Sequence, residues 1–244
     1  MVEYRADQYG ESFADVYDDW YAHVSDVDAT VRTVTAMARG PRVLELGVGT
    51  GRIALALARV GCEVVGIDAS ASMLQRLSRN DPAGLITAVE ADMADFSLGR
   101  SFDAALIAFN TLFNLVSLDA QRSCLACVGS HLVPGGLLFV EAVVPGAAPS
   151  RRGLEAGHLE DGGLVLTATI TDAVTRITRG NHVHIGADGS VRLRPWAILP
   201  TSPNEMDDMA EAAGLELVHR YGDWAGHPFD EDSTTQVSVY RRSH

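Results

Sequence analysis

The stretch VLELGVGTGRIALALARVG, residues 43–61, constrains the fold of this chain more than any other. An apolar run leads directly into glycines at 47, 49 and 51, and an alanine- and leucine-rich segment follows. This order predicts a strand, a glycine turn and a helix. Unpaired N–H groups at the helix start, together with the missing side chains of the turn, let a small ligand approach the backbone. Several nucleotide-type cofactors use such a turn, so the rest of the chain must identify the ligand.

Apolar runs alternate with helical segments through the first 145 residues, which predicts parallel strands joined by crossover helices. After residue 145 the sequence becomes rich in Val, Ile and Thr, and ADGS at 187–190 is a hairpin signal. Ser202, Pro203 and Gly214 then predict the cap, the first residue and the end of another helix, before two last strands. The expected strands are near 42–47, 63–68, 85–90, 103–109 and 136–142, and the expected helices near 51–60, 71–80 and 119–131.

This pattern predicts one α/β domain over residues 1–244. Its four parts are an N-terminal helical lid (1–40), a ligand-binding core (41–145), an inserted antiparallel β cap (146–200), and a C-terminal helix with a strand hairpin (201–244). We expect no nucleic-acid substrate, because the formal net charge of −13 repels a phosphate backbone.

The N-terminus has no basic, apolar leader, and no apolar run approaches the roughly 20 residues of a membrane helix, so we expect a cytoplasmic protein with no membrane association. We also expect no metal site. Cys124 and Cys127 form a C-x-x-C within a predicted amphipathic helix, and no second pair or histidine cluster stands near them in the sequence.

Asp68 closes the second predicted strand, where a carboxylate can accept hydrogen bonds from both hydroxyls of a ribose. The turn and Asp68 together indicate an adenosine-type ligand. The sequence from Gly49 to Ala54 also satisfies the relaxed dinucleotide fingerprint, so NAD is an alternative. Against NAD, the glycine pattern already starts at Gly47, and the chain contains no lysine for a Tyr-x-x-x-Lys dyad.

Five features of the sequence together resemble the class I S-adenosylmethionine (SAM) methyltransferases, and the resemblance extends over nearly the whole chain. They are LELGVGTG, the acid Asp68, the segment EADMADF, the run FDAALIAFNTLFNL and the turn LVPGGLLFVE. The resemblance implies a Rossmann-like seven-stranded sheet whose last strand is antiparallel, with SAM as cofactor and S-adenosylhomocysteine as product. The cofactor-binding residues that it and the site chemistry suggest are Tyr9, Tyr17, Trp20, Glu45, Gly47, Gly49, Asp68, Ala69, Met73, Asp92, Met93, Phe109 and Asn110.

The acceptor is expected beyond the carboxyl ends of strands four and five, because ligands of open α/β sheets bind there. Methyl transfer from a sulfonium is an in-line displacement that requires a general base only when the nucleophile must lose a proton. The chain also resembles nucleotide-sugar N-methyltransferases, in which a histidine often follows strand four. Asn114 occupies that place here, which argues against a histidine base there. The candidate substrate residues are Tyr21, Asn114, Glu141, Arg194, Trp196 and His227, with Asn114, His227 and Tyr17 as weak catalytic candidates.

We therefore expect a SAM-dependent methyltransferase that acts on N or O of a small-molecule acceptor of natural-product or sugar type, as a monomer or homodimer. Two alternatives stay open. One is a SAM-binding enzyme that folds its substrate for cyclisation or dehydration without methylating it. The other is a SAM-sensing binding protein.

Overall fold

The computed structural model describes residues 4–21, 24–146, 152–156 and 163–243. Its main sheet has seven strands in the order β10-β11-β5-β4-β1-β2-β3. Strands β1 to β5 are parallel, β11 runs antiparallel to β5, and β10 runs antiparallel to β11. The predicted seven-stranded sheet is thereby confirmed. The strands are β1 (Arg42–Leu46), β2 (Glu63–Asp68), β3 (Ile86–Glu90), β4 (Phe102–Ile107), β5 (Leu132–Val143), β10 (Leu215–Tyr221) and β11 (Thr235–Arg242).

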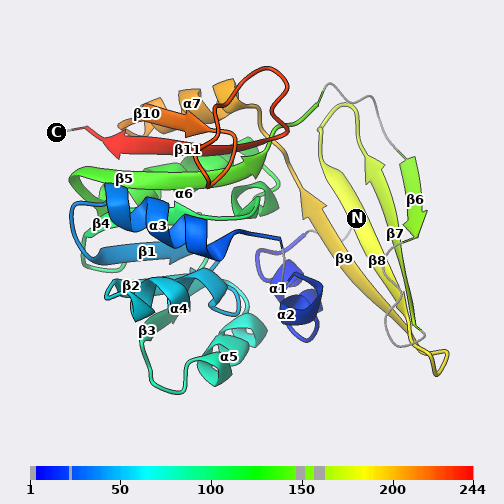
Figure 1. The fold of residues 1–244 in the computed structure, drawn as a ribbon. Helices are drawn as coiled ribbons and strands as arrows, with labels where there is room; N and C mark the ends of the chain where they lie inside the picture. The colour runs from blue at the N-terminus through cyan, green and yellow to red at the C-terminus, as the bar shows by residue number, and fades with distance from the viewer. Residues whose placement is uncertain (1–3, 22–23, 147–151, 157–162, 244) are drawn as a thin grey trace.

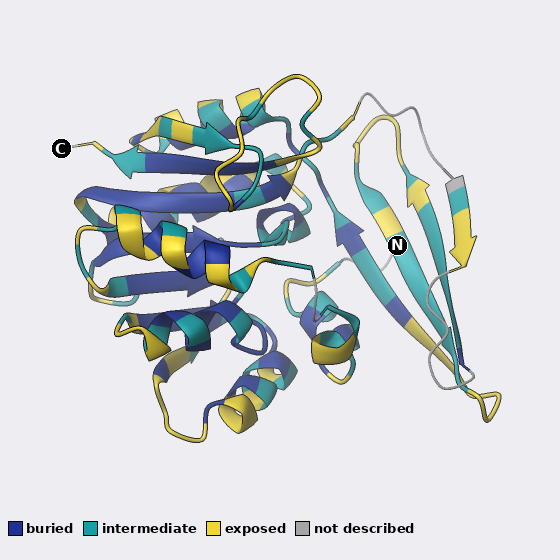
Figure 2. Ribbon diagram, viewed as in Figure 1, coloured by how far each residue is buried: buried dark blue, intermediate teal, exposed yellow. Residues whose placement is uncertain are grey.

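Helices cover both faces of this sheet and bury its apolar side chains (Figures 1 and 2). One face packs against α3, α4 and α5, and the other against α6 and α7. The helices are α3 (Val27–Met37), α4 (Arg52–Arg59), α5 (Ala71–Asn80), α6 (Leu118–His131) and α7 (Pro203–Ala212), with a 3-10 turn, η1 (Thr111–Asn114), after β4. None of the helices in the described ranges is both long and apolar enough to cross a membrane.

Local sequence explains where α7 begins and ends. The Ser202 hydroxyl accepts from the backbone N–H of Glu205, and the Glu205 carboxylate accepts in return from the backbone N–H of Ser202. Pro203 needs no N–H donor at the first helical position, and Gly214 takes the positive φ of +73° that ends the segment. The predicted helix boundaries are confirmed.

A second sheet forms the cap, whose four antiparallel strands stand apart from the core in Figure 1. They are β6 (Arg152–Ala156), β7 (Leu164–Thr171), β8 (Thr178–Ile185) and β9 (Val191–Ile198). The turn over 186–190 closes the predicted hairpin between β8 and β9. Part of the expected cap, residues 147–151 and 157–162, lies outside the described residues.

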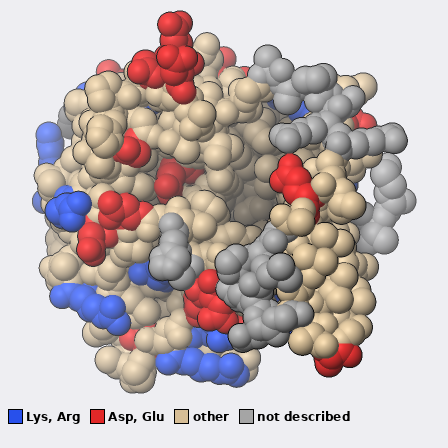
Figure 3. All heavy atoms as spheres, turned by 45° about the vertical axis from the view of Figure 1, so that its right-hand side comes forward, with Lys and Arg blue, Asp and Glu red and all other residues tan. Residues whose placement is uncertain are grey.

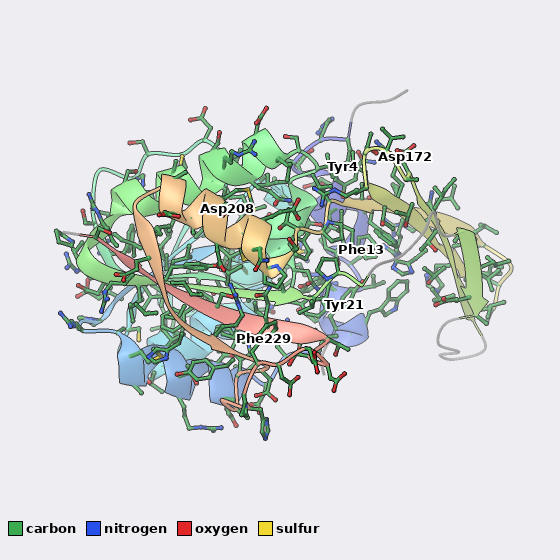
Figure 4. All side chains as sticks on the ribbon, turned by 90° about the horizontal axis from the view of Figure 1, so that it is seen from above. Tyr4, Phe13, Tyr21, Asp172, Asp208 and Phe229 are labelled. Carbon is green, nitrogen blue, oxygen red and sulfur yellow. The ribbon has the colours of Figure 1, made fainter. Side chains whose placement is uncertain are left out.

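Two short helices, α1 (Gln8–Phe13) and α2 (Tyr17–Trp20), lie between core and cap. Phe13 and Tyr21 point into this junction in Figure 4. The expected lid of residues 1–40 divides into two parts. The helices α1 and α2 form one part, and α3 belongs to the core because it buries Ala29 and Val34 against the core sheet. We therefore use "lid" for α1 and α2 alone.

Candidate active site

The glycine turn after β1 is held open on one side and closely packed on the other. Gly47, Gly49 and Gly51 all have positive φ, at +66°, +55° and +87°. A Cβ on Gly47 would lie 2.4 Å from the Thr111 side chain, and one on Gly51 would lie 2.1 Å from that of Leu77. A Cβ on Gly49 would meet nothing closer than the Gly47 carbonyl oxygen at 4.0 Å. Gly49 is therefore the position in the turn where no side chain of the protein fills the space beside the backbone.

Asp68 ends β2 directly opposite this turn. Its carboxylate accepts hydrogen bonds from the backbone N–H groups of Gly49 and Ser70, each at 2.9 Å. Burial raises the pKa of Asp68, and these two hydrogen bonds oppose the rise. The acid and the glycine turn are thus one hydrogen-bonded unit, with the carboxylate fixed at the edge of the sheet.

A cavity opens beside this unit. It brings together ten of the residues named from the sequence: Tyr9, Tyr17, Gly47, Gly49, Asp68, Ala69, Met73, Asp92, Met93 and Asn114. The other lining residues are Ala6, Gly10, Ala91, Thr111 and Leu115. Asp92 also has a local role, because its carboxylate accepts from the backbone N–H of Ala94 at 2.9 Å.

A smaller cavity behind the turn contains Glu45 and Arg52, together with Tyr17 and Gly47. The Glu45 Oε2 and the Arg52 Nε are buried and have no hydrogen-bond partner among the described residues. Burial raises the pKa of Glu45 to about 8, while the nearby Arg52 charge opposes that rise. A buried acid and a nearby cation, each with one buried hydrogen-bonding atom that is unused, are complementary to the ammonium and carboxylate of an amino acid.

Sequence reasoning missed Arg52. The available signal was its position, because Arg52 is the first residue of α4 and directly follows Gly51. A side chain there starts beside the ligand-facing backbone of the turn. The Arg52 guanidinium also donates to the backbone carbonyl of Tyr21, so it connects the glycine turn to the end of the lid.

Two carboxylates of the lid accept hydrogen bonds from segments that line the cavity. Neither was predicted from the sequence. Glu11 accepts from the Ser70 hydroxyl at 2.7 Å and from the Ser72 backbone N–H at 3.0 Å, at the start of α5. Asp18 accepts from the Thr50 hydroxyl at 2.6 Å, within the glycine turn. The lid is therefore hydrogen-bonded to both sides of the cavity that it covers.

Tyr9 and Tyr17 bring their phenol rings from the lid to the cavity wall. Burial raises the pKa of Tyr17 to about 12 and that of Tyr9 well above its usual value, so both phenols are neutral near pH 7. Tyr21 lies beside them, with its ring centroid 4.9 Å from that of Tyr17 and 6.0 Å from that of Phe109.

Three residues expected in the pocket instead join the lid to the cap. The Arg194 side chain is 1% exposed, and it pairs with Asp15 at 2.6 Å and lies over the Trp20 ring. Trp196 packs across Gly180, where a Cβ would lie 2.2 Å from the indole. Arg194, Trp20 and Trp196 do not line either cavity, because the lid–cap contact uses their side chains.

His227 was named as a substrate and catalytic candidate, and it too lies away from both cavities. Its side chain is 73% exposed, in the loop between β10 and β11. The His227 Nδ1 is 2.7 Å from the Asp223 carboxylate, so the ring takes part in a surface contact within its own loop.

The end of β4 differs from the expected strand 103–109. β4 stops at Ile107, because Phe109 and Asn110 adopt positive φ values of 44° and 62°. The Glu141 carboxylate accepts from the Phe109 N–H at 2.8 Å, and the Asn110 side-chain oxygen accepts from the Val143 N–H at 2.6 Å. Glu141 and Asn110 thus hold a strained turn at the mouth of the site, rather than lining the larger cavity.

Comparisons with known proteins agree with this geometry. A family model described as "Methyltransferase domain" matches residues 43–136. The structure of the CcbJ methyltransferase from Streptomyces caelestis is 35% identical and superposes with a TM-score of 0.92, over 99% of this chain and 100% of that one.

Two curated sequences are also similar. A "Cypemycin N-terminal methyltransferase" from a Streptomyces species is 29% identical over 83% of this chain and 84% of that protein. A "dTDP-3-amino-3,6-dideoxy-alpha-D-glucopyranose N,N-dimethyltransferase" from Streptomyces fradiae is 30% identical over 67% of this chain and 65% of that protein. The chain belongs to the class I SAM-dependent methyltransferases of bacterial natural-product type, and its cofactor is SAM.

Proposed function

We propose that this enzyme transfers the methyl group of SAM to an amine nitrogen of a small natural-product-type acceptor. The observation that carries the proposal is the cavity between the glycine turn, Asp68 and the lid. When bound, SAM supplies an electrophilic methyl group. The protein contributes binding, alignment and exclusion of water, and alignment alone is worth up to about 7–11 kcal/mol of the barrier.

The chemistry of the lining residues matches the parts of SAM one by one. Asp68 would accept from the ribose hydroxyls, and Asp92 from the adenine amine, with Met73 and Met93 against the ring. Glu45 and Arg52 have the unused buried atoms that the methionine ammonium and carboxylate need. Their cavity adjoins the larger one at Tyr17 and Gly47, which line both.

The protonation states of the groups that line the cavity favour a nitrogen over an oxygen as the methyl-accepting atom. A neutral amine attacks a sulfonium without first losing a proton, whereas an alcohol needs a base. Tyr9 and Tyr17 hold their protons near pH 7, and the cavity lining that the structure describes contains no histidine. Both curated relatives are named as methyltransferases for amine groups, which supports the same choice.

The acceptor would enter through the hollow between core and cap, which is visible in Figure 3. Acidic side chains flank this hollow, and Asn114 and Thr111 line the cavity. This environment suits a neutral or cationic acceptor better than a polyanion. We further propose that the enzyme acts in the cytoplasm. We also propose that its acceptor is not a nucleic acid, because a net charge of −13 repels a phosphate backbone.

The test is an acceptor screen built from matched pairs, in which each amine is accompanied by the same molecule with a hydroxyl in place of the amino group. We expect S-adenosylhomocysteine and a singly or doubly methylated product from the amines only. The pH at half-maximal rate should move with the pKa of the acceptor amine. Methylation of hydroxyl analogues, or conversion of an acceptor without methylation, would contradict the proposal.

A further inference from the structure

The lid helix α1 packs directly against the start of α5 (Figure 1). A Cβ on Gly10 would lie 2.3 Å from the Ser70 Cβ and 2.7 Å from the Ser70 hydroxyl, so this approach requires glycine. Ser70 is the N-cap of α5, and Gly10 and Tyr9 line the larger cavity. The contact thus joins one wall of the cavity to the turn between β2 and α5 that follows Asp68.

Glu11, the next residue of α1, stabilises this contact. Its carboxylate accepts from the Ser70 hydroxyl at 2.7 Å, from the Ser72 hydroxyl at 2.6 Å and from the Ser72 backbone N–H at 3.0 Å. These bonds lower the pKa of Glu11, with the Ser72 hydroxyl contributing most, so the side chain is a carboxylate at neutral pH. Because Glu11 is exposed, its replacement leaves no cavity in the core.

Ser70 connects Glu11 to the acid of the cavity. The Ser70 hydroxyl donates to Glu11, and the Ser70 backbone N–H donates to Asp68 at 2.9 Å. The same hydroxyl accepts from the Met73 backbone N–H at 3.1 Å, which fixes it at the start of α5. The other oxygen of Asp68 accepts from the Gly49 N–H. One chain of hydrogen bonds therefore runs from the lid through Ser70 to Asp68 and the glycine turn.

The position of Tyr9 depends on the same contact. Tyr9 directly precedes Gly10, and its ring stacks on that of the fully buried Phe13, with the ring centroids 4.5 Å apart. Both rings belong to α1, so the helix and its aromatic side chains form one packed unit. A shift of α1 away from Ser70 would therefore carry the Tyr9 phenol away from the cavity.

We propose that Glu11 is a positioning residue, which ties α1 to Ser70 and Ser72, holds Tyr9 against the bound cofactor and slows release of that cofactor. The inference rests on the cofactor placement proposed above. A ligand enclosed between the lid and the glycine turn leaves only after α1 has separated from α5. That separation breaks three hydrogen bonds to a charged group, which are stronger than bonds between neutral groups. The loss of Glu11 should therefore appear chiefly in the dissociation rate.

The test is the release of radiolabelled S-adenosylhomocysteine into an excess of unlabelled ligand. Glu11→Ala should raise the dissociation rate constant at least about tenfold, which corresponds to the loss of one hydrogen bond to a charged group. Hydrogen exchange in residues 8–13 of the complex should also become faster. Asp19→Ala is the matched control, because it removes the same charge from another exposed position of the lid. This control should release the ligand at the wild-type rate.

Two conservative variants separate the position of the side chain from its charge. Glu11→Gln keeps the length, with an amide oxygen that accepts from both serines and an NH₂ group that donates to the Ser72 hydroxyl, so it should restore slow release. Glu11→Asp keeps the charge but is one methylene shorter, so it should release the ligand as fast as Glu11→Ala. The opposite order would overturn the positioning role. Ser72→Ala should also accelerate release, and it should add little to Glu11→Ala because both variants lose a bond of the same pair.

Asp68→Ala, measured beside these variants, distinguishes failure of this inference from failure of the cofactor placement. If Asp68→Ala binds S-adenosylhomocysteine as tightly as the wild type does, the placement is wrong and the role of Glu11 falls with it. If Asp68→Ala binds weakly while Glu11→Ala releases the ligand at the wild-type rate, the placement stands and Glu11 does not hold the lid. Equal hydrogen exchange in residues 8–13 of wild type and Glu11→Ala would overturn the inference as well.

Discussion

The Glu141 carboxylate accepts a hydrogen bond of 2.8 Å from the backbone N–H of Phe109. This bond supports the strained turn that follows β4. Phe109 and Asn110 are consecutive non-glycine residues with positive φ, an arrangement that costs energy and needs support from its surroundings. The next residue, Thr111, lines the cavity and packs against Gly47. We therefore expect Glu141 to position the cavity wall through Phe109 and Thr111.

The first prediction concerns this support. Glu141→Ala should lower the free energy of unfolding by about 1.5–3 kcal/mol, the contribution of a hydrogen bond to a charged group. It should also lower kcat by up to about a hundredfold, because small misplacements of reacting groups cost that much. Glu141→Gln keeps an acceptor oxygen for Phe109, so it should restore most of both losses. If the Gln variant is as inactive as the Ala variant, the charge of Glu141 acts directly on the acceptor.

A second prediction tests the cofactor assignment. Asp68→Ala removes the acceptor of the Gly49 and Ser70 N–H groups and the partner proposed for the ribose. We expect the dissociation constants of SAM and S-adenosylhomocysteine to rise about 10- to 100-fold by calorimetry. NAD should bind to neither protein. Glu63→Ala, at the exposed start of the same strand, is the control and should leave both constants unchanged.

The core was predictable because its signals are local. The glycine turn, the alternation of strands and helices, and the cap of α7 depend on neighbours in sequence, and the structure has them where expected. The residues predicted to bind the cofactor after β1, β2 and β3 line one cavity, because the carboxyl ends of parallel strands meet at one edge.

The lid and cap were harder to predict because their contacts join distant segments. Arg194 and Asp15 are 179 positions apart, and nothing near either residue indicates the other. Arg194 was predicted to contact the substrate from the cap, whereas in the structure it pairs with the lid carboxylate of Asp15. The exposed position of His227 also depends on how a long loop leaves the sheet, which periodicity does not specify.

A third prediction concerns that lid–cap pair. Asp15→Asn leaves the buried Arg194 charge without its anion, which destabilises a fully buried pair by about 3–5 kcal/mol. Because the Asp15 side chain is 42% exposed, we expect about 1–3 kcal/mol, and faster hydrogen exchange in residues 8–20. Arg176→Gln is the matched control, because its pair with Glu205 is exposed on both sides and should change stability by less than about 0.5 kcal/mol. If hydrogen exchange in the lid is the same in Asp15→Asn as in the wild type, the Asp15–Arg194 pair does not stabilise the lid.

The last prediction follows from the pKa of Glu45, which burial raises from 4.5 to about 8. Between these values the folded protein keeps a proton that the unfolded chain has lost. Glu45 therefore stabilises the fold most below pH 4.5, and this contribution falls as the pH rises to 8, by up to about 1.4 kcal/mol per pH unit. A bound ammonium would favour the carboxylate, so SAM binding at pH 7 should release up to about one proton more from the wild type than from Glu45→Gln. Calorimetry in two buffers of different ionisation enthalpy measures this difference, and equal proton release from the two proteins would place the ammonium away from Glu45.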